Sequence, residues 1–115
     1  DIMIYVPMHI KKKLKRGYNQ TELIAREIAK NIEVDIQVNN LIKVKNNEKQ
    51  SSLTKEKRAE NVKGAFKVKN ADKIKNKKVI LFDDIYTTGS TVNECSRVLK
   101  EAGASQIVVL TIAID

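Results

Sequence analysis

The stretch from residue 79 to residue 92 most constrains what this chain can fold into. Four consecutive apolar residues, Val79 to Phe82, are followed by two acidic residues, Asp83 and Asp84. A short apolar run that is rich in β-branched residues and preceded by polar residues 75–78 is typical of a strand buried on both faces of a parallel sheet. The sequence therefore predicts an α/β fold with two carboxylates at the carboxyl end of this strand.

The loop behind the acids predicts an anion site. It carries four hydroxyl side chains and one glycine, in the order Thr87, Thr88, Gly89, Ser90 and Thr91. It leads into an expected helix over residues 90–102, whose apolar residues recur at helical spacing: Val92, Cys95, Val98, Leu99 and Ala102. The first N–H groups of a helix are unpaired and partly positive, so such a loop can hold a phosphate.

The neighbouring carboxylates complete a ribose-phosphate site. Asp83 and Asp84 cannot bind the phosphate directly because like charges repel, but ionised carboxylates accept hydrogen bonds from sugar hydroxyls and bind a hard cation such as magnesium. The alternative interpretation is a buried strand that ends in a solvated acidic turn. Other phosphate motifs are absent: there is no P-loop, there is no Gly-x-Gly-x-x-Gly, and Ile85 stands where a phosphatase-like Asp-x-Asp needs its second acid.

This stretch resembles the phosphoribosyl pyrophosphate (PRPP) signature of type I phosphoribosyltransferases. In that family the two acids, here Asp83 and Asp84, hold the ribose 2- and 3-hydroxyls, and the loop, here residues 87–91, wraps the 5-phosphate. The resemblance implies the type I fold, which is a parallel β-sheet core flanked by helices with a flexible loop or hairpin. It also implies PRPP or a nucleoside monophosphate as ligand, with Mg²⁺ held through the substrate.

The first part of the chain predicts a second loop at the same edge of the sheet. Ile2 to Val6 is an apolar run that suits a first parallel strand, and residues 8–18 look basic and irregular. Asn19 with Glu22 forms a capping-box pattern that predicts a helix start. The buried face expected for that helix consists of Leu23, Ile24, Ile28 and Ile32.

Two further resemblances concern this region. In type I enzymes the loop after the first core strand binds pyrophosphate. The resemblance implies that role for Pro7, Met8, His9 and Arg16. The alternative interpretation of His9 is an exposed loop histidine without a role. The block Arg16-Gly17-Tyr18-Asn19-Gln20, followed by Leu23, Ile24 and Ala25, resembles a motif of the ComF family of phosphoribosyltransferase-like proteins. The alternative interpretation of this block is a loop arginine followed by a helix cap. It accounts for Asn19 but leaves Tyr18 and Gln20 unexplained.

The middle of the chain predicts small elements. Residues 34–44 suggest a strand or hairpin at the sheet edge, residues 54–62 a short helix and residues 65–68 a strand. The spacing of Gln50, Leu53, Arg58, Asn61 and Phe66 is similar to a ComF pattern, which implies that this region is the loop closing over the active site. Without this resemblance, the alternative interpretation of the segment is a solvated surface loop. Residues 106–114 predict a last parallel strand.

Composition limits the alternatives. The 115 residues suit one domain, 1–115, and the only cysteine, Cys95, allows neither a disulfide nor a cysteine-based zinc site; we expect it to be a packed thiol. The net charge of +8 favours anionic ligands, and single-stranded DNA is one candidate. The alternative interpretation is that the charge reflects only a general lysine bias of the sequence. No apolar run reaches the ~20 residues that a membrane helix needs. We expect a cytoplasmic protein with no membrane contact, and a homodimer is compatible with these features.

The resemblance implies an activity and an alternative to it. The activity is transfer of a phosphoribosyl group to a nitrogen nucleophile with release of pyrophosphate. The alternative is a non-catalytic PRPP-binding or DNA-binding module for DNA uptake in natural competence, with single-stranded DNA or a helicase as partner. Thr87 stands where enzymes for oxopurines carry an Asp, so we do not expect hypoxanthine or guanine as acceptor. ComF proteins commonly begin with a zinc-binding and hood segment; its absence, and the start at Asp1, predict a fragment of a longer protein.

Overall fold

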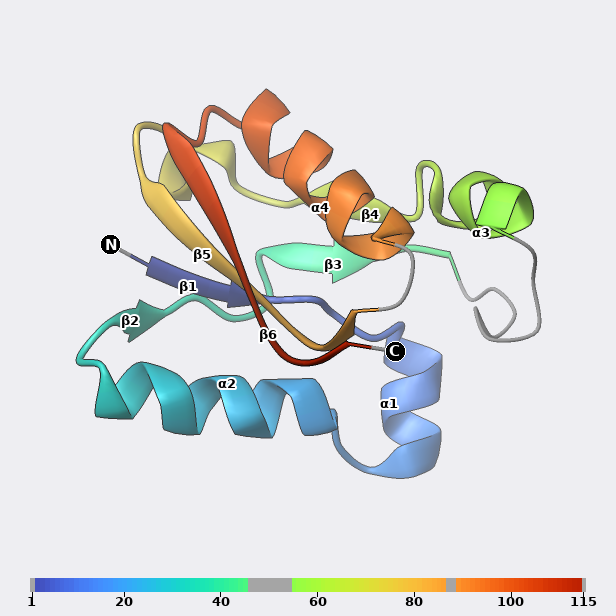
Figure 1. Ribbon diagram of the computed structural model, residues 1–115, viewed down its shortest axis with the longest axis horizontal. Coiled ribbons are helices and arrows are strands. Elements are labelled where there is room, and N and C mark those ends of the chain that lie inside the picture. Colours follow the sequence, from blue (N-terminus) through green and yellow to red (C-terminus); the bar gives the residue numbers. More distant parts are fainter. Residues whose placement is uncertain (1, 46–54, 87–88, 115) are drawn as a thin grey trace.

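The computed structural model describes residues 2–45, 55–86 and 89–114. Four parallel strands form the central sheet in the order β2-β1-β5-β6. Helix α2 covers one face of this sheet, and helix α4 covers the other together with a small antiparallel pair, β3 and β4 (Figure 1). The elements are β1 (Ile2–Tyr5), α1 (Ile10–Arg16), α2 (Gln20–Asn31), β2 (Asp35–Ile36), β3 (Leu41–Lys43), α3 (Lys55–Val62), β4 (Phe66–Val68), the 3₁₀ turn η2 (Ala71–Lys73), β5 (Lys78–Tyr86), α4 (Ser90–Glu101) and β6 (Gln106–Ile114).

Strand alternation divides the core into two layers. On the α4 side, Ile4 and Leu81 pack with Leu99 and with residues of β3 and β4. On the α2 side, Met3, Tyr5 and Phe82 pack against two alanines of the helix. Because successive side chains of a strand point to opposite faces, β1 and β5 each contribute to both layers. The apolar runs at residues 2–6, 79–82 and 106–114 therefore form the parallel strands that the sequence predicts.

Helix α2 buries a different face from the expected one. Its buried residues are Ala25 and Ala29, one turn apart, while Leu23 is 54% exposed and Ile32 is 48% exposed. The small alanine side chains let the helix lie close to the sheet, and the larger residues beside this stripe are only partly covered. The prediction was therefore wrong for Leu23 and Ile32, and Ile24 and Ile28 flank the buried stripe.

The basic segment after β1 is helical, which the prediction of an irregular segment missed. Residues 10–16 form α1, and none of its residues is buried. Lys and Arg are good helix formers, and the basic last turn complements the helix dipole. Its two apolar residues, Ile10 and Leu14, are 60% and 75% exposed, so the helix buries no apolar face.

Two other boundaries differ from expectation. Residues 34–44 form two short strands in different sheets: β2 extends the central sheet at the edge beside β1, and β3 pairs with β4. Strand β5 continues through Tyr86, so that Asp83 and Asp84 lie within it and not behind it. The predicted short helix and the strand after it are confirmed as α3 (Lys55–Val62) and β4 (Phe66–Val68), while Thr54 lies outside the described residues. The inner face of α4 is confirmed, and Cys95 is a buried core thiol as predicted.

Candidate functional site

Asp83 and Asp84 lie at the carboxyl end of β5 and point to opposite faces of the sheet. Asp84 is on the α2 side, where its Oδ1 accepts a hydrogen bond of 3.1 Å from the Thr21 hydroxyl. Asp83 is on the α4 side with Leu81; burial raises the pKa of the Cys95 thiol, and the charge of Asp83 raises it further. Both carboxylates are half-buried. One carboxylate therefore faces each helix that flanks the sheet.

The start of α4 has no side-chain cap. Gly89 occupies the cap position with a φ of 83°, a left-handed conformation that favours glycine, and this cap residue makes no side-chain cap hydrogen bond. The first turn of α4 also carries no acidic residue, whereas His9 caps α1 and Asn19 caps α2. The first N–H groups of α4 are thus suited to an external anion. Ser90 and Thr91 are half-buried there, and Thr87 and Thr88 lie outside the described residues.

The loop after β1 begins beside this edge. The Val6 N–H donates to the Phe82 carbonyl at 2.9 Å, which holds the start of the loop against the residue that precedes Asp83. Within the loop, His9 Nδ1 accepts from the Lys11 N–H at 3.1 Å and so caps α1. The His9 ring therefore caps a helix. The sequence analysis considered only a pyrophosphate ligand or a histidine without a role.

The ComF-like block forms the corner between α1 and α2. Gly17 ends α1 with a φ of 90°, and its N–H donates to the Lys13 carbonyl at 2.7 Å. Asn19 begins α2, because its Oδ1 accepts from the Thr21 N–H at 3.0 Å. Tyr18 and Gln20 are exposed. The corner thereby brings the first turn of α2, with Thr21, against Asp84.

Arg16 does not join the other residues assigned to the pyrophosphate loop. It is exposed in the last turn of α1, and the helix separates it from His9 by about 10 Å of rise. Of the residues proposed for the closing loop, Gln50 lies outside the described residues and only the backbone of Arg58 is described. Asn61 is half-buried in α3.

The sequence analysis did not predict a partly buried ion-pair network around Glu22. The Glu22 carboxylate accepts from Lys13 at 3.2 Å and from Arg26 at 2.9 Å and 3.0 Å. Burial alone would raise the pKa of Glu22, but hydrogen bonds from Arg26, Lys13 and Tyr5 lower it below its ordinary value. Burial, with the charge of Glu22 and its hydrogen bond, raises the pKa of Tyr5. Glu22 thus joins α1 to α2 and does not complete the reciprocal capping box that its spacing from Asn19 suggested. The i, i+4 spacing of Glu22 and Arg26 was the sequence signal for their ion pair.

Glu94 is a second acid that the sequence pattern did not single out. It lies on the inner side of α4, is 9% exposed and accepts from the Gly64 N–H at 2.9 Å and from Arg97 at 2.7 Å. The Arg97 hydrogen bonds, against the opposing effect of burial, lower the pKa of Glu94. Glu94 therefore ties α4 to the turn between α3 and β4.

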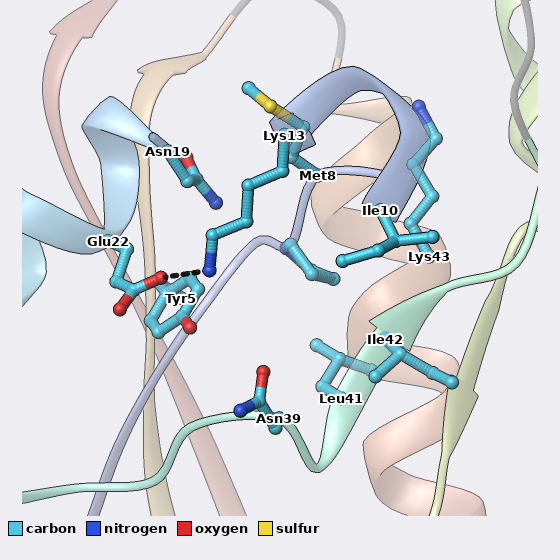
Figure 2. Close-up of a pocket in the computed structure, with 11 residues that line it drawn as sticks. Tyr5, Met8, Ile10, Lys13, Asn19, Glu22, Asn39, Leu41, Ile42 and Lys43 are labelled. Atoms are coloured by element: carbon cyan, nitrogen blue, oxygen red, sulfur yellow. Dashed lines mark hydrogen bonds and ion pairs between the residues drawn. The ribbon is translucent and has the colours of Figure 1, made fainter. Parts of the chain in front are cut away.

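A cavity of about 170 Å³ opens next to the loop after β1 (Figure 2). It lies between that loop, α1, the first turn of α2 and β3. Its lining residues are Tyr5, Pro7, Met8, Ile10, Lys13, Asn19, Glu22, Asn39, Leu41, Ile42 and Lys43. Asp83 and Asp84 do not line it, although Asp84 contacts Thr21 in the same turn of α2.

The described part of the chain shows neither a group of metal ligands nor a membrane-spanning helix. Within residues 2–45, 55–86 and 89–114, no three or more His, Cys, Asp or Glu side chains group closely enough to hold a metal ion. Among the helices of these same segments, none has the length and apolar character needed to cross a bilayer.

Comparison with known proteins identifies the class. Residues 15–114 match the family model described as "Phosphoribosyl transferase domain". The crystal structure of phosphoribosylpyrophosphate synthetase from Mycobacterium smegmatis superposes with a TM-score of 0.56 at 16% identity, over 98% of this chain and 27% of that one, which shows the fold alone. The chain belongs to the phosphoribosyl transferase domain family and has the type I fold that the resemblance implies.

Two curated relatives narrow the class. "Competence protein F" of Haemophilus influenzae is 33% identical over 115 residues, which is 98% of this chain and 50% of that protein. "Competence protein ComFC" of Streptococcus pneumoniae is 55% identical over 31 residues, 27% of this chain and 14% of that protein. Within the phosphoribosyltransferase superfamily, both relatives support the resemblance of this chain to the ComF family. The chain spans half the length of the Haemophilus protein.

The Glu22 network makes stability depend on pH. The folded state holds the pKa of Glu22 below its ordinary value of 4.5, so its contribution is present above that value and is lost as pH falls through the folded pKa. We expect Glu22→Gln to lower the free energy of unfolding by about 1–2 kcal/mol at pH 7, because an amide N–H₂ would face three donors. The difference should shrink below pH 4.5. Urea unfolding at pH 7 and at low pH measures both values.

Glu27→Gln is the matched control for this prediction. Glu27 lies on the same helix and is exposed. The control variant should unfold like the wild type at pH 7. Equal stability of Glu22→Gln and wild type at pH 7 would contradict the role of the network.

Proposed function

We propose that this domain binds the ribose 5-phosphate part of PRPP or of a nucleoside monophosphate at the carboxyl end of β5. The observation that carries the proposal is the uncapped start of α4 behind two carboxylates. The phosphate would accept from the first N–H groups of α4, with Gly89 allowing close approach. Asp83 and Asp84 would accept from the ribose hydroxyls.

In the whole protein we infer transfer of the phosphoribosyl group to a nitrogen nucleophile, with loss of pyrophosphate from C1 of the ribose. The backbone of the loop at Pro7, Met8 and His9 starts beside β5 and would face the leaving group. Exclusion of water and fixed positioning would supply most of the rate, as is general for reactions of this type. A cytoplasmic location is part of the same proposal.

A magnesium ion would suit one carboxylate of this edge together with substrate oxygens, because Asp83 and Asp84 face opposite sides of the sheet. Mg²⁺ prefers oxygen ligands and commonly takes one or two carboxylates, with substrate phosphates and water as the remaining ligands. Asp83 and Asp84 supply half-buried carboxylate oxygens at the end of the strand. When bound with PRPP, the ion would neutralise negative charge on the pyrophosphate.

The carboxylates can be tested directly. We expect the double variant Asp83→Asn, Asp84→Asn to bind ribose 5-phosphate at least tenfold more weakly than the wild type, because amides are weaker acceptors for hydroxyls than carboxylates. Isothermal calorimetry measures the affinity, and circular dichroism verifies the fold.

The control removes a carboxylate elsewhere. Asp35 is exposed in β2, where it pairs with Ile2 at the amino end of the sheet. Asp35→Asn should bind like the wild type. Unchanged affinity in the folded Asp83, Asp84 double variant would rule out their proposed role.

A second candidate is binding of single-stranded DNA, and the surface of α1 favours it. Five of the seven residues of α1 are basic, namely Lys11, Lys12, Lys13, Lys15 and Arg16, and all but Lys13 are exposed. Leu14 is 75% exposed on the same helix, and Tyr18 behind it is 47% exposed. Basic side chains beside an exposed aromatic ring suit a phosphate backbone and a stacked base. The competence names of the relatives suggest DNA uptake as the context for such binding, with a helicase as a further partner.

The DNA candidate has its own charge-matched test. We expect Lys12→Glu, Lys15→Glu to weaken binding of a single-stranded oligonucleotide and to reduce the slope of log affinity against log salt by about 0.7 per lost phosphate contact. Lys30→Glu, Lys67→Glu changes the net charge equally at two exposed positions elsewhere. Fluorescence anisotropy at several salt concentrations gives the slopes. Equal slopes for the two double variants would exclude α1 as the DNA surface.

A further inference from the structure

The Thr21 hydroxyl makes a contact between α2 and the pair of carboxylates in β5. Its Oγ1 donates to Oδ1 of Asp84 at 3.1 Å, although 63 positions of the chain separate the two residues. An ionised carboxylate only accepts hydrogen bonds, so the hydroxyl is the donor. In Figure 1, α2 begins at the end of the molecule where β5 and β6 end. The bond therefore reaches the edge of the sheet at which we propose that the ribose binds.

The position of Thr21 in α2 leaves its hydroxyl available for this bond. Inside a helix, a threonine hydroxyl can bond to the backbone carbonyl four residues earlier. Thr21 is the second residue of α2, and the residue four positions earlier is Gly17, which ends α1. Helix α2 thus has no carbonyl of its own at that place, and the hydroxyl donates across to β5 instead.

Two features determine where this hydroxyl points. Asn19, which is 5% exposed, caps α2, and its Oδ1 accepts from the Thr21 N–H at 3.0 Å. Threonine is also branched at Cβ, and such side chains have few χ1 states in a helix. The capped start of α2 therefore holds a half-buried donor in a defined place and direction.

The Asp84 carboxylate needs such a partner, because its backbone alone does not orient it. The pairing of β5 with β6 fixes the backbone on both sides of Asp84: Asp83 pairs with Thr111, and Ile85 pairs with Ala113. The last side-chain torsion of an aspartate is broad, however, so the plane of the carboxylate can turn about a fixed backbone. A hydrogen bond at one oxygen restricts this rotation, and the other oxygen can accept from a further donor.

We propose that Thr21 is a positioning residue of the ribose site, which holds the Asp84 carboxylate in the orientation that accepts a sugar hydroxyl. This role rests on the ribose-phosphate site proposed above and assigns part of its geometry to α2. Thr21 would act through Asp84 and would not contact the ligand. A carboxylate that is already oriented loses less freedom on binding, and such pre-organisation strengthens affinity.

Thr21→Val tests this role, because it removes the hydroxyl and keeps the branched shape. Valine and threonine have similar helix propensities, so α2 should stay intact. We expect the variant to bind ribose 5-phosphate about three- to tenfold more weakly than the wild type, because the carboxylate must then be ordered on binding. Thr21→Ser keeps the donor and should bind within about twofold of the wild type. NMR titration measures the affinities, and urea unfolding verifies that each variant folds.

Inorganic phosphate is the matched control ligand, since it has no sugar hydroxyl for Asp84 to accept from. Thr21→Val should bind it like the wild type. A double-mutant cycle with Asp84→Ala then shows whether Thr21 acts through the carboxylate. In the Asp84→Ala background, Thr21→Val should cause no further loss of affinity for ribose 5-phosphate. Should Thr21→Val fail to fold, Thr21→Ala removes the same hydroxyl with the best helix former.

Three results would overturn the proposal. They are an unchanged affinity for ribose 5-phosphate in folded Thr21→Val, an equal loss of affinity for inorganic phosphate, and the same fold-change in the Asp84→Ala background as in the wild type. A folded wild type that does not bind ribose 5-phosphate would instead refute the ribose-phosphate site, and the role of Thr21 with it. The two failures are distinguishable, because only the second is seen without any variant.

Discussion

The parallel pairing of β1 with β5 is the interaction on which the rest of the structure depends. Tyr5 lies opposite Phe82, and the hydrogen bond from Val6 to Phe82 extends the ladder to the last residue before the carboxylates. In a parallel sheet the carboxyl ends of neighbouring strands lie at one edge, and ligands of open α/β sheets bind outside this edge. The loop after β1 therefore starts beside Phe82, directly before the two carboxylates in β5.

Two helix starts then determine what that edge can bind. Asn19 caps α2 and so brings Thr21 to Asp84, while Gly89 leaves α4 uncapped toward the opposite face. Because consecutive residues of a regular strand point to opposite faces, Asp83 and Asp84 divide between the two helices. The glycine at one start and the asparagine at the other make the two sides different: α4 begins without a side-chain cap, where we propose that the phosphate binds, and α2 begins with a capped turn.

The sequence was informative where a local pattern is also the cause of the structure. Continuous apolar runs predicted the strands around Leu81 and Val109, and helical spacing predicted the inner face of α4. The sequence did not predict α1, because this helix is mostly basic and has no buried face. Nor did it predict the partners of Glu22 and Glu94, since these depend on how separate elements meet. The ribose-phosphate site stays a proposal that rests on the motif. The motif did not show that Asp83 and Asp84 lie within β5 and face opposite sides of the sheet.

The most direct measurement is the change in backbone amide shifts of the first turn of α4 when ribose 5-phosphate is added. If the phosphate accepts from these groups, the amide protons of Ser90, Thr91 and Val92 should move downfield and saturate together, and inorganic phosphate should move the same set more weakly. Saturable binding with the largest shifts elsewhere, or no shift in this turn at saturating ligand, would contradict the account.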